Sequence, residues 1–121
     1  MSSPVVIRPH FQSQTHARIV LSPTVGARIG RDRRFPVFVV AFPLAAQYDA
    51  AYLAKDRDYV LKPQRKLREI CERLGIAFYD IYPDLTARHF VADGVHLTPE
   101  GRRVAGAHIA SFLVKSGLLR P

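Results

Sequence analysis

The 121 residues are enough for one domain at most, and a small one for an α/β enzyme. The hydrophobic share of 48% is ordinary for a globular protein, and no apolar run reaches the roughly 18 residues that suggest a membrane span. No apolar stretch of the kind found in secretory signals follows the first charged residues, so we expect a cytoplasmic protein. The single cysteine, Cys71, can form no internal disulfide.

The formal net charge of +8 is unevenly distributed. Residues 1–34 contain six Arg and one Asp, a net charge of +5, whereas residues 35–121 contain 12 Lys or Arg and nine acidic residues, a net charge of +3. Clustered arginines neutralise phosphates, so a nucleic-acid-binding arm is one interpretation. Aromatic residues argue against it, because Phe11 is the only one before Phe35.

Residues 1–34 are expected to be a basic, poorly ordered N-terminal segment. Prolines interrupt its first part, and only the residues 19–21 (Ile-Val-Leu) suggest a short strand, which Ser22 would follow. Residues 26–34 contain two glycines and a run of charges, and they suggest a loop. An ordered α/β segment is expected from residue 35 to residue 121.

The ordered segment opens with a buried strand. Residues 36–42 form a continuous apolar run that Pro43 ends, as in parallel strands covered on both faces. Residues 44–58 are expected to be a long connection. One interpretation of its tyrosines, Tyr48 and Tyr52, is that they pack against the scaffold.

A helix is predicted from Tyr59 or Pro63 to Leu74, and Gly75 ends it. Its apolar stripe includes Cys71, which we interpret as a small core residue rather than a nucleophile. Residues 76–82 then predict a second strand, so that strand, helix and strand form a right-handed βαβ unit. Asp80 within this strand is interpreted as structural.

The most informative stretch is Asp93-Gly-Val-His96, followed directly by a helix start. Thr98 is a good N-cap, Pro99 suits the first helical position, and the helix is predicted to end near residue 115. Asp93 and His96 therefore lie in a short loop held by a capped helix, where a histidine base and its orienting carboxylate could sit. The alternative is a coincidental pair, a solvated Asp beside a surface or packed His.

Cofactor and metal motifs are not found. The histidines lack HxxxH spacing, a single cysteine cannot build a zinc site, and His108 within the last helix is expected to be packed or exposed. The chain contains neither a GxxxxGK[ST] loop nor a GxGxxG turn. We therefore expect no cofactor and no bound metal.

Residues 93–105, Asp-Gly-Val-His-Leu-Thr-Pro-Glu-Gly-Arg-Arg-Val-Ala, resemble the C-terminal D-G-x-H-L-x-x-x-G block of the SGNH/GDSL hydrolase superfamily. The resemblance covers about residues 35–119 and corresponds to the C-terminal half of such an enzyme. It implies that residues 44–58, with Tyr48 and Tyr52, form a loop on the substrate side of the sheet. It implies part of a three-layer αβα sandwich, flavodoxin-like, with parallel strands. It also implies that Asp93 and His96 are the acid and base of a Ser-His-Asp site that hydrolyses small carboxylic esters, as in esterases and lipases.

The rest of the family's machinery is missing from the sequence. There is no Gly-Asp-Ser block for the nucleophile, and the chain has no asparagine for the oxyanion hole. Ser22 is the nearest candidate nucleophile, although no Gly-Asp precedes it and Pro23 follows it. Because one lost oxyanion donor costs on the order of a hundredfold in rate, the chain alone is expected to have weak activity or none.

Two other interpretations remain open. One is a non-catalytic α/β binding module that uses the basic N-terminal arm, and the other is a truncated gene product. Two strands bury little surface on their own. An ordered chain is therefore expected to recruit a third strand near Ile19, or to pair with a second copy or a partner that completes the sheet.

Overall fold

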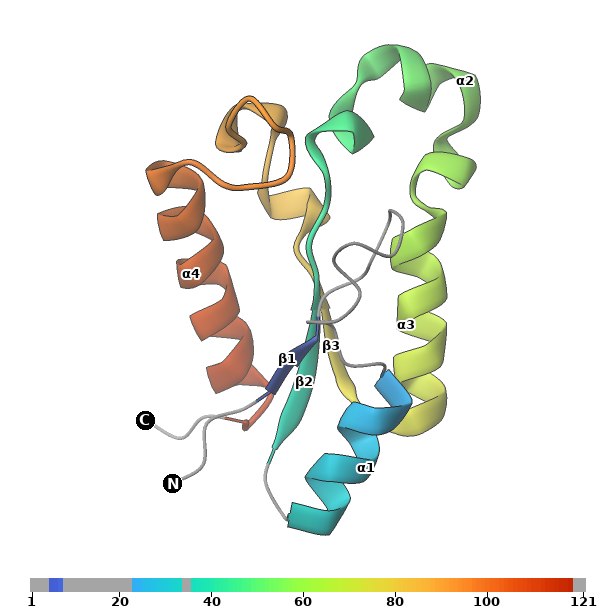
Figure 1. Ribbon diagram of the computed structural model, residues 1–121, viewed down its shortest axis with the longest axis vertical. Coiled ribbons are helices and arrows are strands. Elements are labelled where there is room, and N and C mark those ends of the chain that lie inside the picture. The colour runs from blue at the N-terminus through green and yellow to red at the C-terminus, as the bar shows by residue number, and fades with distance from the viewer. Residues whose placement is uncertain (1–4, 8–22, 34–35, 119–121) are drawn as a thin grey trace.

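The computed structural model describes residues 5–7, 23–33 and 36–118, and these form a mixed α/β fold (Figure 1). The elements in chain order are β1 (Val5–Ile7), α1 (Pro23–Arg33), β2 (Val37–Ala41), α2 (Ala50–Val60), α3 (Lys62–Leu74), β3 (Ala77–Asp80) and α4 (Pro99–Lys115). Short 3₁₀ helices cover Ala45–Tyr48, Tyr82–Asp84 and Ala87–His89. Within the described residues the three strands form one parallel sheet in the order β1-β2-β3.

The central strand β2 is buried on both faces, as the apolar run predicts. Phe38 and Val40 belong to a core that α4 covers, whereas Val39 and Ala41 belong to a core that α3 covers. This alternation follows from the two-residue period of a strand. Figure 1 shows the result: α4 lies on one side of the sheet, and α1 and α3 lie on the other.

The predicted helices of the second half are confirmed. Helix α3 ends at Gly75, whose φ of 69° is the left-handed conformation that favours glycine after a helix. Helix α4 begins at Pro99, and the Thr98 hydroxyl accepts a hydrogen bond from the Gly101 amide at 3.0 Å. Cys71 is fully buried against the sheet, which confirms it as a core residue.

The long connection expected over residues 44–58, a loop in the family that the sequence resembles, is mostly helical. This stretch contains the 3₁₀ helix Ala45–Tyr48 and most of α2. The Asp49 side chain caps α2 by accepting hydrogen bonds from the amides of Ala51 and Tyr52. None of the α2 side chains is buried, so the helix has no apolar stripe from which it could be predicted.

The expectation of a loop over residues 26–34 is wrong, because α1 occupies Pro23–Arg33. Two glycines disfavour a helix in isolation, but Ala27 is buried and α1 packs against α3 and β2. Tertiary packing therefore outweighs intrinsic propensity at this position.

The third strand is β1, within the segment that was expected to be poorly ordered, and it pairs with β2 from Val5 opposite Val37. The predicted strand at residues 19–21 and Ser22 lie outside the described residues. None of the described helices is both long and apolar enough to cross a bilayer.

Candidate acid–base site

The loop of residues 91–98, called here the D-x-x-H loop, lies near the carboxyl edge of the sheet. It joins the 3₁₀ helix Ala87–His89 to α4, beyond the end of β3 (Figure 1). Open parallel sheets bind ligands at this edge, where loops from neighbouring strands meet. The fold thus places the loop where α/β proteins usually hold their functional residues.

Backbone hydrogen bonds fix the two ends of the loop. The Val91 amide donates to the His96 carbonyl at 2.9 Å, and the Thr98 amide donates to the His89 carbonyl at 2.8 Å. The close packing also requires Gly101, because a Cβ there would lie 2.4 Å from the His89 carbonyl oxygen. This contact gives a physical reason for glycine at the last position of the block.

The tip of the loop is tied to the connection that follows β2. Gly94 has a φ of 71°, a conformation that glycine adopts without strain. Its carbonyl accepts a hydrogen bond from the Ala45 amide at 2.9 Å, and a Cβ on Gly94 would touch the Ala45 side chain at 3.5 Å. The loop is therefore braced from both β2 and α4.

Asp93 and His96 are in direct contact within this frame. Asp93 Oδ2 lies 2.6 Å from His96 Nδ1, while Asp93 Oδ1 accepts hydrogen bonds from the amides of Val95 at 2.8 Å and His96 at 2.9 Å. One carboxylate thus closes the turn and orients the imidazole at the same time. The predicted pair is brought together as the spacing suggests.

The electrostatics of the pair determine which ring nitrogen is available. The hydrogen bonds from the His96 ring and from the amides of His96 and Val95 lower the pKa of Asp93 to about 2. An ionised carboxylate can only accept, so Nδ1 of His96 must carry a proton. In the neutral imidazole Nε2 then holds the lone pair, as a general base requires.

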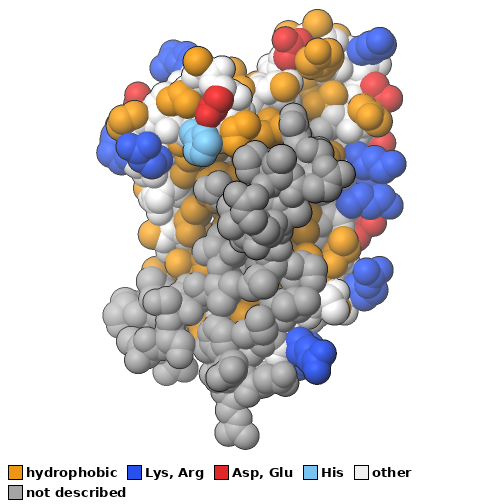
Figure 2. Space-filling view, viewed as in Figure 1, with side chains coloured by type: hydrophobic (Ala, Val, Ile, Leu, Met, Phe, Trp, Pro, Cys, Tyr) orange, Lys and Arg blue, Asp and Glu red, His pale blue; other side chains and the backbone are white. Residues whose placement is uncertain are grey.

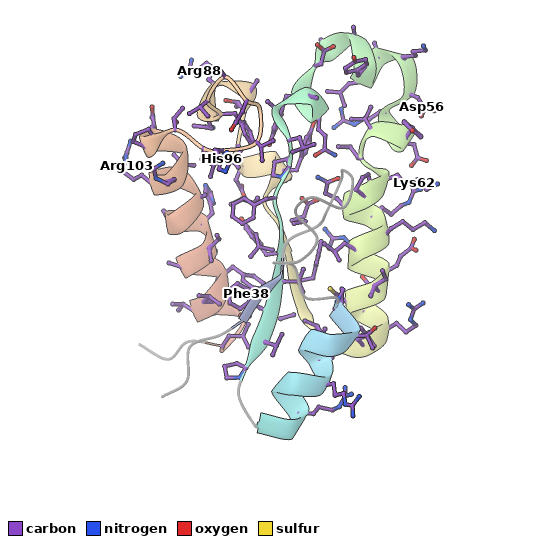
Figure 3. The ribbon with its side chains drawn as sticks, in the orientation of Figure 1. Phe38, Asp56, Lys62, Arg88, His96 and Arg103 are labelled. Atoms are coloured by element: carbon purple, nitrogen blue, oxygen red, sulfur yellow. The ribbon has the colours of Figure 1, made fainter. Side chains whose placement is uncertain are left out.

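The His96 ring is open to solvent, with 75% of the side chain exposed, and Asp93 is 48% exposed. One histidine is visible on the face shown in Figure 2, beside acidic and hydrophobic side chains, at the position where Figure 3 labels His96. No side chain within the described residues bonds Nε2. The nucleophile position next to His96 is therefore not filled from the described part of the chain.

Other reactive groups serve the scaffold. Asp80 is half-buried at the end of β3 and accepts a hydrogen bond from the Tyr82 amide at 3.0 Å; burial raises its pKa. Burial also raises the pKa of the Cys71 thiol to about 11, which keeps it protonated. Among the described residues no three metal-ligating side chains form a cluster that could hold an ion.

Two polar pairs that sequence reasoning missed support the carboxyl edge. The rings of Tyr48 and Tyr82 stack with their centroids 4.5 Å apart. The Tyr48 hydroxyl donates a hydrogen bond to the Tyr82 carbonyl, and the Tyr82 hydroxyl donates one to the Gln47 carbonyl, each at 2.8 Å. The amides of Gln47 and Gln64 bond each other in both directions, at 2.9 and 3.0 Å, while buried. Residues this far apart in sequence carry no local signal of such pairing.

Comparison with known proteins gives no match: no protein-family model, no curated protein and no solved structure is significantly similar to this chain.

Proposed function

We propose that this chain carries the acid–base half of an SGNH/GDSL-type hydrolase that acts on small carboxylic esters. The observation that carries the proposal is the 2.6 Å contact between Asp93 Oδ2 and His96 Nδ1 in a loop braced at the carboxyl edge of a parallel sheet. Helices on both faces of that sheet support the corresponding fold, part of a flavodoxin-like three-layer αβα sandwich.

In the proposed mechanism His96 acts first as a general base. Its Nε2 removes the proton from the attacking hydroxyl as the oxygen forms a bond to the ester carbonyl carbon, and the imidazolium then gives that proton to the leaving alkoxide. Asp93 keeps the proton on Nδ1 and stabilises the imidazolium. These two steps leave the acyl group on the attacking oxygen, and a water molecule then removes it by the same sequence, with His96 taking the proton from water and giving it back to that oxygen.

Ser22 is the proposed nucleophile within this chain, and it lies outside the described residues. The oxyanion donors are likewise not assigned to any described residue. Because His96 is exposed, water also reaches it, and a water-filled site weakens electrostatic stabilisation of the transition state. The expected activity of the chain alone is therefore weak.

The test is the hydrolysis of p-nitrophenyl acetate by the full chain and three variants. His96→Ala should remove most of the protein-dependent rate. The matched control is His108→Ala, since His108 is also partly exposed and its Nδ1 lies 3.6 Å from the Asp84 carboxylate; this variant should keep the rate. Loss in Ser22→Ala would assign the nucleophile. Equal rates in the wild type and His96→Ala would contradict the proposal.

A further inference from the structure

An open groove of about 790 Å³ lies beneath α2, between the connection that follows β2 and the start of α3. Apolar parts of its wall come from Ala46, Tyr52, Tyr59, Val60 and Pro63. The volume falls within the range of about 300–1,000 Å³ that is typical of small-molecule sites.

The two tyrosines leave apolar ring surface uncovered. Tyr52 is 58% exposed and Tyr59 is 72% exposed, although both rings line the groove. The backbone of α2 leaves helical geometry at Asp56, so that Tyr52 and Lys55 before this break and Tyr59 and Val60 after it all line the same groove. Exposed apolar surface that gathers in a concavity marks a binding site more often than scattered exposed residues do.

Charged residues also line the groove. Lys55 and Lys62 line it, and within the described residues neither ammonium has an ion-pair or hydrogen-bond partner. Asp56 also lines it, but its carboxylate accepts a hydrogen bond from the Tyr59 amide at 3.0 Å. The groove thus offers two unpartnered cations beside an apolar wall. Figure 3 shows Asp56 and Lys62 across the molecule from His96.

Two basic side chains of α3 outside the groove differ from Lys55 and Lys62. Arg65 pairs with Asp58, and Lys66 lies 3.5 Å from Glu69. The lysines of the groove are therefore distinguished from these two side chains by the absence of a described partner as well as by their position.

We propose that the groove beneath α2 binds an anionic amphiphile, an unbranched alkyl chain that ends in a carboxylate. The chain would lie against Tyr52, Tyr59 and Val60, and the carboxylate would bond to Lys55 and Lys62. Burial of methylenes supplies the affinity, and the two ammonium groups select the charge of the head. This inference does not rest on ester hydrolysis.

The test is isothermal titration calorimetry of the full chain with decanoate, below the concentration at which it forms micelles. Decyltrimethylammonium, which has the same chain length and the opposite charge, is the comparison ligand. Saturable binding of decanoate, at least about tenfold tighter than that of decyltrimethylammonium, is expected. No saturable decanoate binding, or equal binding of the two, would overturn the proposal.

Variants locate the site. Lys55→Glu with Lys62→Glu should weaken decanoate binding about tenfold. Lys66→Glu with Arg103→Glu changes the net charge equally outside the groove, and it should alter binding less than about twofold. Tyr59→Ser, an exposed position where the fold should tolerate the change, should weaken the binding of both ligands. Equal losses in the two double variants, or no loss in Tyr59→Ser, would contradict the assignment.

Discussion

The D-x-x-H loop and helix α2 both stand beyond the carboxyl ends of the strands, but they are held in different ways. The loop has no regular structure and an exposed His96, yet Asp93, Gly94 and Thr98 each form a hydrogen bond that fixes it. Helix α2 is regular in most of its length, yet none of its side chains is buried. The loop is therefore held both by hydrogen bonds and by Leu97, which packs against the core that α4 covers, whereas α2 has no buried side chain to hold it.

The loop and the helix also suit different activities. A rigid loop suits proton transfer, because a small misplacement of the base is costly in rate. A helix that is anchored mainly at its ends suits a binding groove, because its exposed face can adjust to a ligand. Helix α2 also departs from helical geometry at Asp56, with φ −161° and ψ 86°.

The largest expected loss of stability comes from replacing Gln47, whose side chain donates a hydrogen bond to the Val60 carbonyl at the end of α2. Gln47→Leu leaves the Leu44 amide, the Val60 carbonyl and the Gln64 side chain without their buried partner. We expect a loss of about 3 kcal/mol in the free energy of unfolding, measured by urea denaturation. Tyr52→Ser, on the exposed face of α2, should change it by less than about 0.5 kcal/mol. Equal losses of unfolding free energy in the two variants would contradict the view that contacts at the ends of α2, rather than on its exposed face, hold the helix in place.

Gly101→Ala tests the packing of the D-x-x-H loop on α4. The added methyl would collide with the His89 carbonyl, so a loss of about 2 kcal/mol in the free energy of unfolding is expected. Gly106→Ala in the same helix is the matched control. A Cβ there meets nothing within 4 Å, and the change should stabilise the protein by up to about 1 kcal/mol. Stabilisation by both variants would contradict the close approach of position 101 to the His89 carbonyl.

A smaller effect is expected from the cap of α4. Thr98→Ala removes the acceptor of the Gly101 amide and should cost about 1 kcal/mol, measured by thermal or urea unfolding. Thr98→Ser keeps the hydroxyl and should retain most of the stability. If Ser and Ala at this position proved equally destabilising, the methyl group and not the cap would be the important part of the side chain.

The smallest effect is on the pH dependence of stability. The folded-state pKa of Asp93 is about 2, below its ordinary value of 3.8, so the ionised carboxylate favours the folded state. Its contribution is fully present above about pH 4 and is lost as the pH falls towards 2. Asp93→Asn should therefore flatten the dependence of unfolding free energy on pH between 4 and 2. If unfolding free energy depended on pH equally in the wild type and in Asp93→Asn between pH 4 and 2, the hydrogen bonds assigned to the Asp93 carboxylate would be contradicted.

Elements with a strong local signal could be predicted from the sequence. The continuous apolar run predicts β2, the apolar stripe that stops at Gly75 predicts α3, and Thr98 with Pro99 predicts the start of α4. The contact between Asp93 and His96 was predictable for the same reason, since three-residue spacing before a capped helix leaves little conformational choice.

Elements that depend on distant contacts could not be predicted. Helix α1 contains two glycines and forms where Ala27 packs against the scaffold, and β1 has three residues whose partner is β2, far along the chain. The Gln47–Gln64 pair is invisible in sequence because polar side chains usually face solvent. Here their amides satisfy each other, which removes the cost of burial.

The central claim is that Asp93 holds His96 in the tautomer that leaves Nε2 free to act as a base. The most direct measurement is ¹⁵N nuclear magnetic resonance of the His96 ring at a pH where the imidazole is neutral, in the wild type and in Asp93→Asn. The account predicts that Nδ1 carries the proton in the wild type and that the two tautomers mix in the variant. A wild-type ring protonated mainly at Nε2 would contradict it.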